Sequence, residues 1–293
     1  MSKIRLFNEK MYNFTYCKCL YGLLEMDFTR YNPEGSLLRR DQKELHRILT
    51  VVARICEEHN IQWWLDSGTL LGALRHKGFI PWDDDVDIVL MKEDYDRLEE
   101  ILCNLDDEEF VFHCNRTDKD YVNTFGKFRK KEGCVKVKSK RYDYYKWAGV
   151  GLDVFAIEKI NYPAVAIGRF FYKLFTNYTV HIRNRRLRHS LISFGQFICF
   201  KLLFPVLRLI GKINPKGEYH YALGIGWTKT AYDLDTLLPL SEAEFEGVVM
   251  PAPHDADGYL RKLYGDWRKF PTEEQIKKAI HCQEYKEEIF GKE

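Results

Sequence analysis

Closely spaced acidic residues follow a Gly-Thr pair in the stretch LDSGTLLGALRHKGFIPWDDDVDIVL, which runs from Leu65 to Leu90. Asp83, Asp85 and Asp87 occupy alternate positions, and an extended strand places such side chains on one face. The spacing predicts converging carboxylates, which repel one another unless a cation lies between them. Mg²⁺ suits such a cluster because it also accepts phosphate oxygens, and Mn²⁺ is the alternative. We therefore expect metal-dependent phosphate chemistry, and the strand-like continuation VDIVL argues against a merely solvated turn.

The Gly-Thr pair precedes the acids and follows an apolar segment that predicts a strand over 61–65. Gly68 and Thr69 open a short helical pattern, and unpaired amides at a helix start bind anions. Arg75 lies near the far end of that helix and adds positive charge, although solvent exposure is the competing interpretation. We expect this turn to hold a substrate phosphate.

Four blocks of this sequence resemble the LicD family, which includes fukutin and fukutin-related protein. They are LDSGTLLGALRHKGFIPWDDDVDI, MKEDYDRLEEIL, GVGLDVFAIE from Gly149 to Glu158, and FEGVVMPAPHDADGYLRKLYGDWRKFP from Phe245 to Pro271. The blocks span roughly residues 45–162 and 237–281. The resemblance implies an α/β (α+β) fold of the nucleotidyltransferase superfamily, with a mixed sheet flanked by helices.

The resemblance also implies roles for particular residues. Gly68 and Thr69 match the turn of the superfamily pattern, and Asp153 matches a third acid on a later strand. The acids so assigned to the metal and to catalysis are Asp85, Asp87 and Asp153, with Asp83 as an additional metal ligand. Without the resemblance, Asp153 reads as an ordinary polar residue at the end of a strand.

The implied reaction moves phosphocholine from CDP-choline onto a sugar hydroxyl of a cell-surface glycan and releases CMP. The glycan could be lipopolysaccharide, teichoic acid or capsule. The fukutin-like branch implies CDP-ribitol or another CDP-alcohol as donor. Three further functions stay open: a nucleotidyltransferase that makes the CDP-alcohol, a glycosyltransferase that uses its own DxD, and an inactive protein that binds a glycan or nucleotide. The presence of every expected acid disfavours the inactive protein.

The chain divides into an N-terminal extension (1–40), a catalytic core (41–162), a basic and aromatic helical insertion (163–213) and a C-terminal part with a helical cap (214–293). In the core, apolar spacing predicts a helix capped by Asp41, a second helix over 92–105 and strands near 109–113 and 124–129. Lys127 and Arg129 lie two apart on the last strand, so we expect them to meet the substrate diphosphate, unless this is a solvated edge strand.

The insertion mixes aromatic and aliphatic residues with many arginines and lysines. Its apolar run, 191–210, contains Lys201 and Arg208, and charges at a bilayer centre are costly, so a helix pair packed on the core or at a membrane interface is favoured over a membrane span. Peripheral contact with an anionic membrane therefore remains open. Nucleic acid is not an expected partner, because no motif accompanies the basic residues and the net charge is only +2.

The remaining signals concern compartment and substrate. Eight cysteines show no zinc-type spacing, and no signal peptide is seen, which favours a reduced cytoplasmic protein, located at the inner face of the membrane if the insertion contacts lipid. The aromatic residues of Tyr264–Trp267 could stack on a base or attract a quaternary ammonium, with core packing as the competing interpretation.

Overall fold

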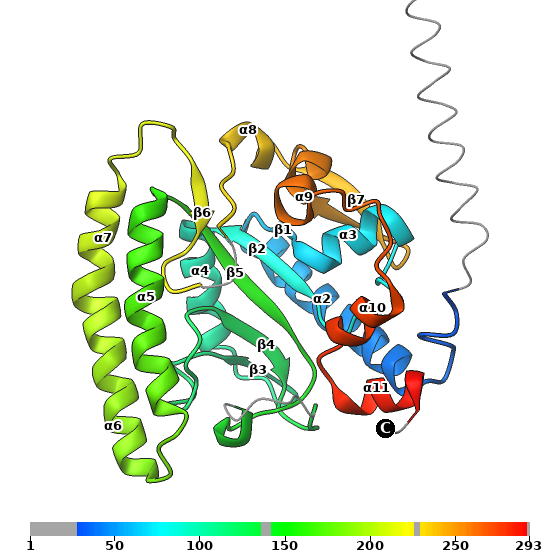
Figure 1. Ribbon diagram of the computed structural model, residues 1–293, viewed down its shortest axis with the longest axis horizontal. Coiled ribbons are helices and arrows are strands. Elements are labelled where there is room, and N and C mark those ends of the chain that lie inside the picture. Colours follow the sequence, from blue (N-terminus) through cyan, green and yellow to red (C-terminus); the bar gives the residue numbers. More distant parts are fainter. Residues whose placement is uncertain (1–27, 136–141, 226–228, 292–293) are drawn as a thin grey trace, which may run out of the picture.

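A six-stranded mixed sheet forms the centre of the computed structural model, which describes residues 28–135, 142–225 and 229–291 (Figure 1). The strand order is β1-β2-β5-β4-β3, and β6 pairs with β5. The bounds are β1 Trp64–Leu65, β2 Asp87–Met91, β3 Phe110–His113, β4 Gly126–Lys130, β5 Gly151–Lys159 and β6 Tyr219–Tyr221. β2 and β5 are parallel, whereas all other pairs are antiparallel. The predicted mixed α/β fold is thus confirmed, and most of the expected N-terminal extension lies outside the described residues.

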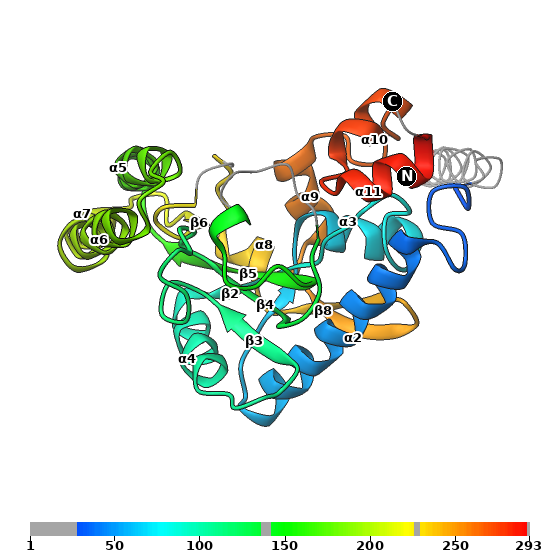
Figure 2. The ribbon, with the colours of Figure 1, turned by 90° about the horizontal axis from the view of Figure 1, so that it is seen from below.

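Two amphipathic helices cover one face of this sheet (Figure 2). They are α2, Leu37–Glu58, and α4, Lys92–Cys103. The buried side chains of α2 recur at helical spacing, as predicted. Its cap was predicted wrongly: Ser36, not Asp41, accepts a hydrogen bond from the amide of Arg39. Asp41 lies inside the helix and accepts a hydrogen bond from the hydroxyl of Tyr285.

The last part of the chain returns to the sheet domain and packs beside the acidic region. It contains α8 Leu234–Leu237, β7 Ser241–Phe245, β8 Val248–Ala252, α9 Ala256–Tyr264, α10 Glu273–Ala279 and α11 Gln283–Phe290. α9 packs against α3, Ser67–His76, the short helix that precedes the acids. α11 reaches the start of α2, where Glu288 accepts hydrogen bonds from the amides of Leu37 and Leu38.

A helical hairpin stands at the side of the sheet (Figures 1 and 2). Its first helix is α5, Tyr162–Thr179. The second runs without a break from Arg185 to Gly211 through α6 Arg185–Gln196, a π-helical segment Phe197–Leu203 and α7 Phe204–Gly211. A small apolar cluster, separate from the main core, joins the hairpin to Ile160 and Leu223, which lie beside β5 and β6.

Candidate active site

Three neighbouring strands place two acids and a lysine in a row. Asp87 begins β2 and lies directly opposite Asp153 of the parallel strand β5. Lys127 of β4 is the register partner of Asp153 on the other side. Its ammonium nitrogen lies 2.9 Å from Oδ1 of Asp153, and both side chains are largely buried. Because register partners on neighbouring strands project from the same face, sheet pairing itself assembles this site.

The two other predicted acids come from a loop, not from a strand. The sequence predicted that Asp83, Asp85 and Asp87 share one strand face, but β2 begins only at Asp87. A turn at the start of the loop, closed by a hydrogen bond from the amide of Asp83 to the carbonyl of Ile80, directs the chain toward β5. Pairing with β5 is first made by the carbonyl of Val86. The prediction that Asp83, Asp85 and Asp87 converge because they share one face of a strand was therefore wrong.

The acids nevertheless lie close enough to perturb one another. Burial and the charge of Asp85 raise the pKa of Asp87 well above its ordinary value, and Asp153 adds to this effect. Burial and Asp84 raise the pKa of Asp85 to about 6. Burial and Asp85 likewise raise the pKa of Asp83. Carboxylates in this state are stabilised by a cation, so the donor set fits a divalent metal ion.

The predicted phosphate turn is in direct contact with these acids. Thr69 is buried, and its hydroxyl oxygen accepts a hydrogen bond of 2.9 Å from the amide of Asp87. A Cβ atom on Gly68 would lie only 2.6 Å from Oδ2 of Asp83. Glycine therefore leaves room for this carboxylate at the first turn of α3, where any larger residue would force the Asp83 side chain to move. Amides of the first turn have no partner within a helix, so the site keeps donors beside the acids.

Asp66 holds the start of α3 in place. It is completely buried, and its carboxylate accepts hydrogen bonds from the amide of Ser67 and from the hydroxyls of Tyr221 and Tyr259 at 2.6 to 2.8 Å. These tyrosines come from β6 and α9, so the C-terminal part of the chain orients the helix start. An Asp just before a helical pattern predicts a helix cap, but no local sequence pattern predicts that Tyr221 and Tyr259 bind it.

Arg75 is half-buried at the end of α3. Its guanidinium donates a hydrogen bond of 3.2 Å to the carbonyl of Trp267 and lies 4.7 Å from the centre of the Phe270 ring. Burial lowers its pKa to about 10, whereas the charge of Asp83 opposes this shift. Arg75 thus lies in the electrostatic field of the acidic loop, and its role toward a substrate stays a prediction.

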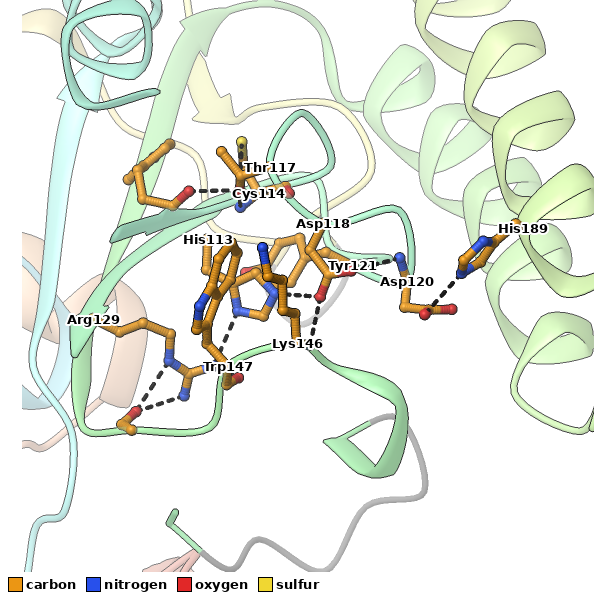
Figure 3. Close-up of polar contacts among 12 residues, drawn as sticks. His113, Cys114, Thr117, Asp118, Asp120, Tyr121, Arg129, Lys146, Trp147 and His189 are labelled. Atoms are coloured by element: carbon orange, nitrogen blue, oxygen red, sulfur yellow. Dashed lines mark hydrogen bonds and ion pairs between the residues drawn. The ribbon is translucent and has the colours of Figure 1, made fainter. Parts of the chain in front are cut away.

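Arg129 has a different position from the one its sequence spacing suggested (Figure 3). It is buried, and its guanidinium donates to the carbonyls of Gly149 and Trp147 at 2.8 to 3.0 Å. It also lies 3.1 Å from Nδ1 of His113, whose other ring nitrogen contacts Asp118 at 2.8 Å. Arg129 therefore supports the loop beside the site, and we do not place it among the diphosphate ligands. Lys127 alone of this pair lies at the acids.

Two residues of the C-terminal part reach the acids: His281 was missed from the sequence, whereas Tyr264 belongs to the aromatic group that was considered for a base or a quaternary ammonium. Nδ1 of His281 lies 3.1 Å from Asp84 and 3.7 Å from Asp85, and the hydrogen bond to Asp84 raises the pKa of His281. Tyr264 is 49% exposed, and its partial burial together with the charge of Asp87 raises the pKa of its hydroxyl. By contrast, Trp267 is buried, and its indole N–H donates a hydrogen bond to Asp257. Trp267 therefore packs in the core, which was the alternative to a substrate contact.

Comparisons with known proteins show what this chain is similar to. Residues 60–182 match the model of the LicD/FKTN/FKRP nucleotidyltransferase domain. The chain is 27% identical to the lipopolysaccharide cholinephosphotransferase LicD of Haemophilus influenzae, over 84% of this chain and 97% of that protein. It is also 37% identical to the human ribitol 5-phosphate transferase FKRP over 59 residues, which are 20% of this chain and 12% of that protein. The chain therefore carries a domain of the LicD/FKTN/FKRP nucleotidyltransferase family over residues 60–182, and its named relatives are transferases of substituted phosphate groups.

Proposed function

We propose that this protein is a metal-dependent phosphotransferase that moves phosphocholine from CDP-choline to a sugar hydroxyl of a cell-surface glycan and releases CMP. The observation that carries the proposal is the row of Asp87, Asp153 and Lys127 across three strands, beside the first turn of α3. Such a site combines acids for a cation with donors for phosphate, which is what phosphoryl transfer requires.

Asp85, Asp87 and Asp153 would hold the divalent ion, with Asp83 as a further oxygen donor. When bound, Mg²⁺ neutralises phosphate charge and polarises the group that is transferred. The chain itself supplies a fixed positive charge at Nζ of Lys127 and the helix-start amides of α3. These groups bind the diphosphate and hold its charge away from bulk water. We assign Asp153 to orienting the acceptor hydroxyl, because Lys127 keeps one of its oxygens in place.

Choline is favoured over ribitol by two observations. The similarity to the cholinephosphotransferase covers nearly the whole of that protein, whereas the similarity to the ribitol phosphate transferase covers 59 residues. In addition, Tyr264 presents a half-exposed aromatic ring close to the acids. The negative face of such a ring attracts a quaternary ammonium group, which ribitol lacks. CDP-ribitol is therefore the second candidate donor.

Product analysis tests this proposal. The full chain is incubated with Mg²⁺, a glycan acceptor from the host and either CDP-choline or CDP-ribitol, and products are identified by mass spectrometry. We expect CMP and a glycan that carries phosphocholine, and we expect Asp153→Asn to abolish both. In a parallel incubation with CTP in place of the CDP-alcohol, release of pyrophosphate would instead identify an enzyme that makes the CDP-alcohol. Turnover of a UDP-sugar, or no turnover of any donor, would also contradict the proposal.

A further inference from the structure

The α5–α7 hairpin buries only its inner side. Its apolar cluster includes Tyr172 of α5 and Cys199, Phe204 and Leu207 of the second helix. Gly195 lets the helices approach closely, since a Cβ there would lie 2.9 Å from the Phe175 ring. The cluster also includes Ile160 and Leu223 from outside the hairpin, so it fixes the two helices to each other and to the sheet domain. The sides of the helices that face away from these contacts are their outer sides.

Large apolar side chains are concentrated on those outer sides. Of the nineteen that are exposed among the described residues, fourteen lie between Ile167 and Ile213. We name six of these, all on the helices and 51 to 71% exposed, the outer apolar stripe: Phe170, Tyr178, Phe194, Phe197, Leu202 and Leu209. A soluble monomer rarely exposes so many neighbouring apolar groups without a binding function.

The charge of the hairpin selects the kind of partner. Between Glu158 and Glu218 the sequence contains eleven Lys and Arg residues and no Asp or Glu. Arg183, Arg185 and Arg186 are exposed at the turn between the helices, and Lys201 is exposed on the second helix. The hairpin thus exposes apolar groups interleaved with positive charges, and it has no acid of its own to balance them. This combination is complementary to a lipid surface with anionic headgroups.

The second helix is long and apolar enough to cross a bilayer, but its contacts hold it against the sheet domain. At one end, Arg188 and His189 contact the buried carboxylate of Asp120 at 2.9 and 2.8 Å. At the other end, Arg208 lies 2.7 Å from Glu158, which belongs to β5. A membrane-crossing position would separate these ion pairs, so the helix is held in an arrangement that suits lying along the surface.

We propose that the outer apolar stripe and the basic residues around it dock this protein on the surface of an anionic bilayer without crossing it. The apolar side chains enter the boundary between headgroups and acyl chains, while Lys and Arg side chains reach the lipid phosphates. The anionic cytoplasmic leaflet supplies such a surface. None of these residues belongs to the acid cluster, so docking and phosphotransfer are separable.

Vesicle co-sedimentation of the full chain tests the docking surface. We expect binding to vesicles of phosphatidylglycerol and phosphatidylcholine, and at least tenfold weaker binding to phosphatidylcholine alone or in 1 M NaCl. The double variant Phe194→Ser/Phe197→Ser and the charge reversal Arg183→Glu/Arg186→Glu are each expected to weaken binding at least tenfold. Val249→Ser is the matched control, because Val249 is 62% exposed but lies on β8, away from the hairpin.

Each contrary outcome overturns the proposal. Protein that stays in the supernatant, or binds both vesicle types equally, has no anionic docking surface. Protein that resists extraction with alkaline carbonate crosses the membrane instead. A dimer seen by light scattering and dissociated by Phe194→Ser/Phe197→Ser, without vesicle binding, would assign the stripe to a second copy. Circular dichroism confirms that the variants fold, and unchanged transfer to a soluble acceptor separates loss of docking from loss of catalysis.

Discussion

Asp87 is the residue at which the crowding of the acids most clearly lowers the stability of the fold. Its carboxylate is crowded by Asp85 and Asp153, and burial in this company raises its pKa well above the ordinary value. A folded-state pKa above the unfolded-state value means that the ionised form is destabilised by folding. In the proposed function a bound cation recovers this free energy, so metal binding would stabilise the folded chain.

Replacing Asp87 with Asn is therefore expected to have opposite effects on stability and activity. Without metal, the variant should melt at least about 2 °C higher, because one unit of pKa corresponds to about 1.4 kcal/mol. Transfer activity should fall more than about a hundredfold, since even residues that only support metal ligands contribute roughly 10- to 100-fold. Differential scanning fluorimetry in EDTA and a CMP-release assay measure the two effects. Glu242→Gln, an exposed acid on β7, should change neither, and a lower melting temperature for Asp87→Asn would refute the repulsion argument.

At this scale the sequence predicted the acids better than the basic residues. Asp85 and Asp87 could be identified from spacing, because acids near a Gly-Thr turn form a local pattern. Asp153 was reached through family resemblance alone, and its pairing with Asp87 depends on a parallel register that no local signal encodes. Arg129 shares the strand of Lys127, but the carbonyls that hold its guanidinium belong to residues about twenty positions away.

Among the elements, α3 depends most on close packing of backbone against backbone. A Cβ on Gly72 would lie 2.4 Å from the carbonyl oxygen of Gly78 and 3.0 Å from the amide nitrogen of Ile80. Both contacts are to the main chain of the segment that leads into the acidic loop. The helix can therefore approach this segment only where it has no side chain.

Gly72→Ala is accordingly expected to destabilise the protein by about 1 to 3 kcal/mol, as overpacking does. Helix propensity alone would predict a gain of up to about 1 kcal/mol, so the sign of the change distinguishes the two effects. Urea unfolding measures it, with Ser193→Ala on an exposed position of α6 as the propensity control. A stabilised Gly72→Ala protein would show that the segment moves away freely.

The elements that were predicted well have strong periodicity of their own. α2 and α4 bury regular stripes of apolar side chains, and their bounds lie within a few residues of those expected. The strand predicted over 61–65 is paired only at Trp64 and Leu65, with Val89 and Ile88 of β2. The acidic loop alternates like a strand, but a turn and a hydrogen bond to Thr69 determine its path instead.

Over the whole molecule, contacts between distant parts of the chain close the site. Asp84 accepts hydrogen bonds from the amides of His281 and Cys282 at 3.0 and 2.8 Å, and Glu288 caps the first turn of α2. The C-terminal helices thus join the acidic loop to the first helix of the core. Such pairs, 197 to 251 positions apart, carry no periodic signal, so the sequence could not predict His281 as a neighbour of the acids.

The buried titratable groups make the stability of the whole chain depend on pH in two opposing ways. Burial lowers the pKa of four histidines, which are His46, His76, His113 and His220. Below their unfolded-state pKa the unfolded chain binds more protons, so these groups destabilise the fold as pH falls. The acid cluster has the opposite effect. Asp85 has a pKa of about 6, so its protonation at lower pH removes repulsion between the acids and stabilises the fold.

His76 allows the histidine effect to be isolated. Burial, reinforced by the charge of Arg75, lowers its pKa from 6.5 to about 3. Between pH 7.5 and 5.0 the unfolded state therefore binds a proton at His76 that the folded state does not bind. This lowers the free energy of unfolding by about 2 kcal/mol. We expect His76→Asn to remove this cost, so that the stability difference between wild type and variant changes by about that amount in favour of the variant. Urea unfolding at both pH values in EDTA measures the change, and a constant difference would mean that His76 is protonated equally in both states.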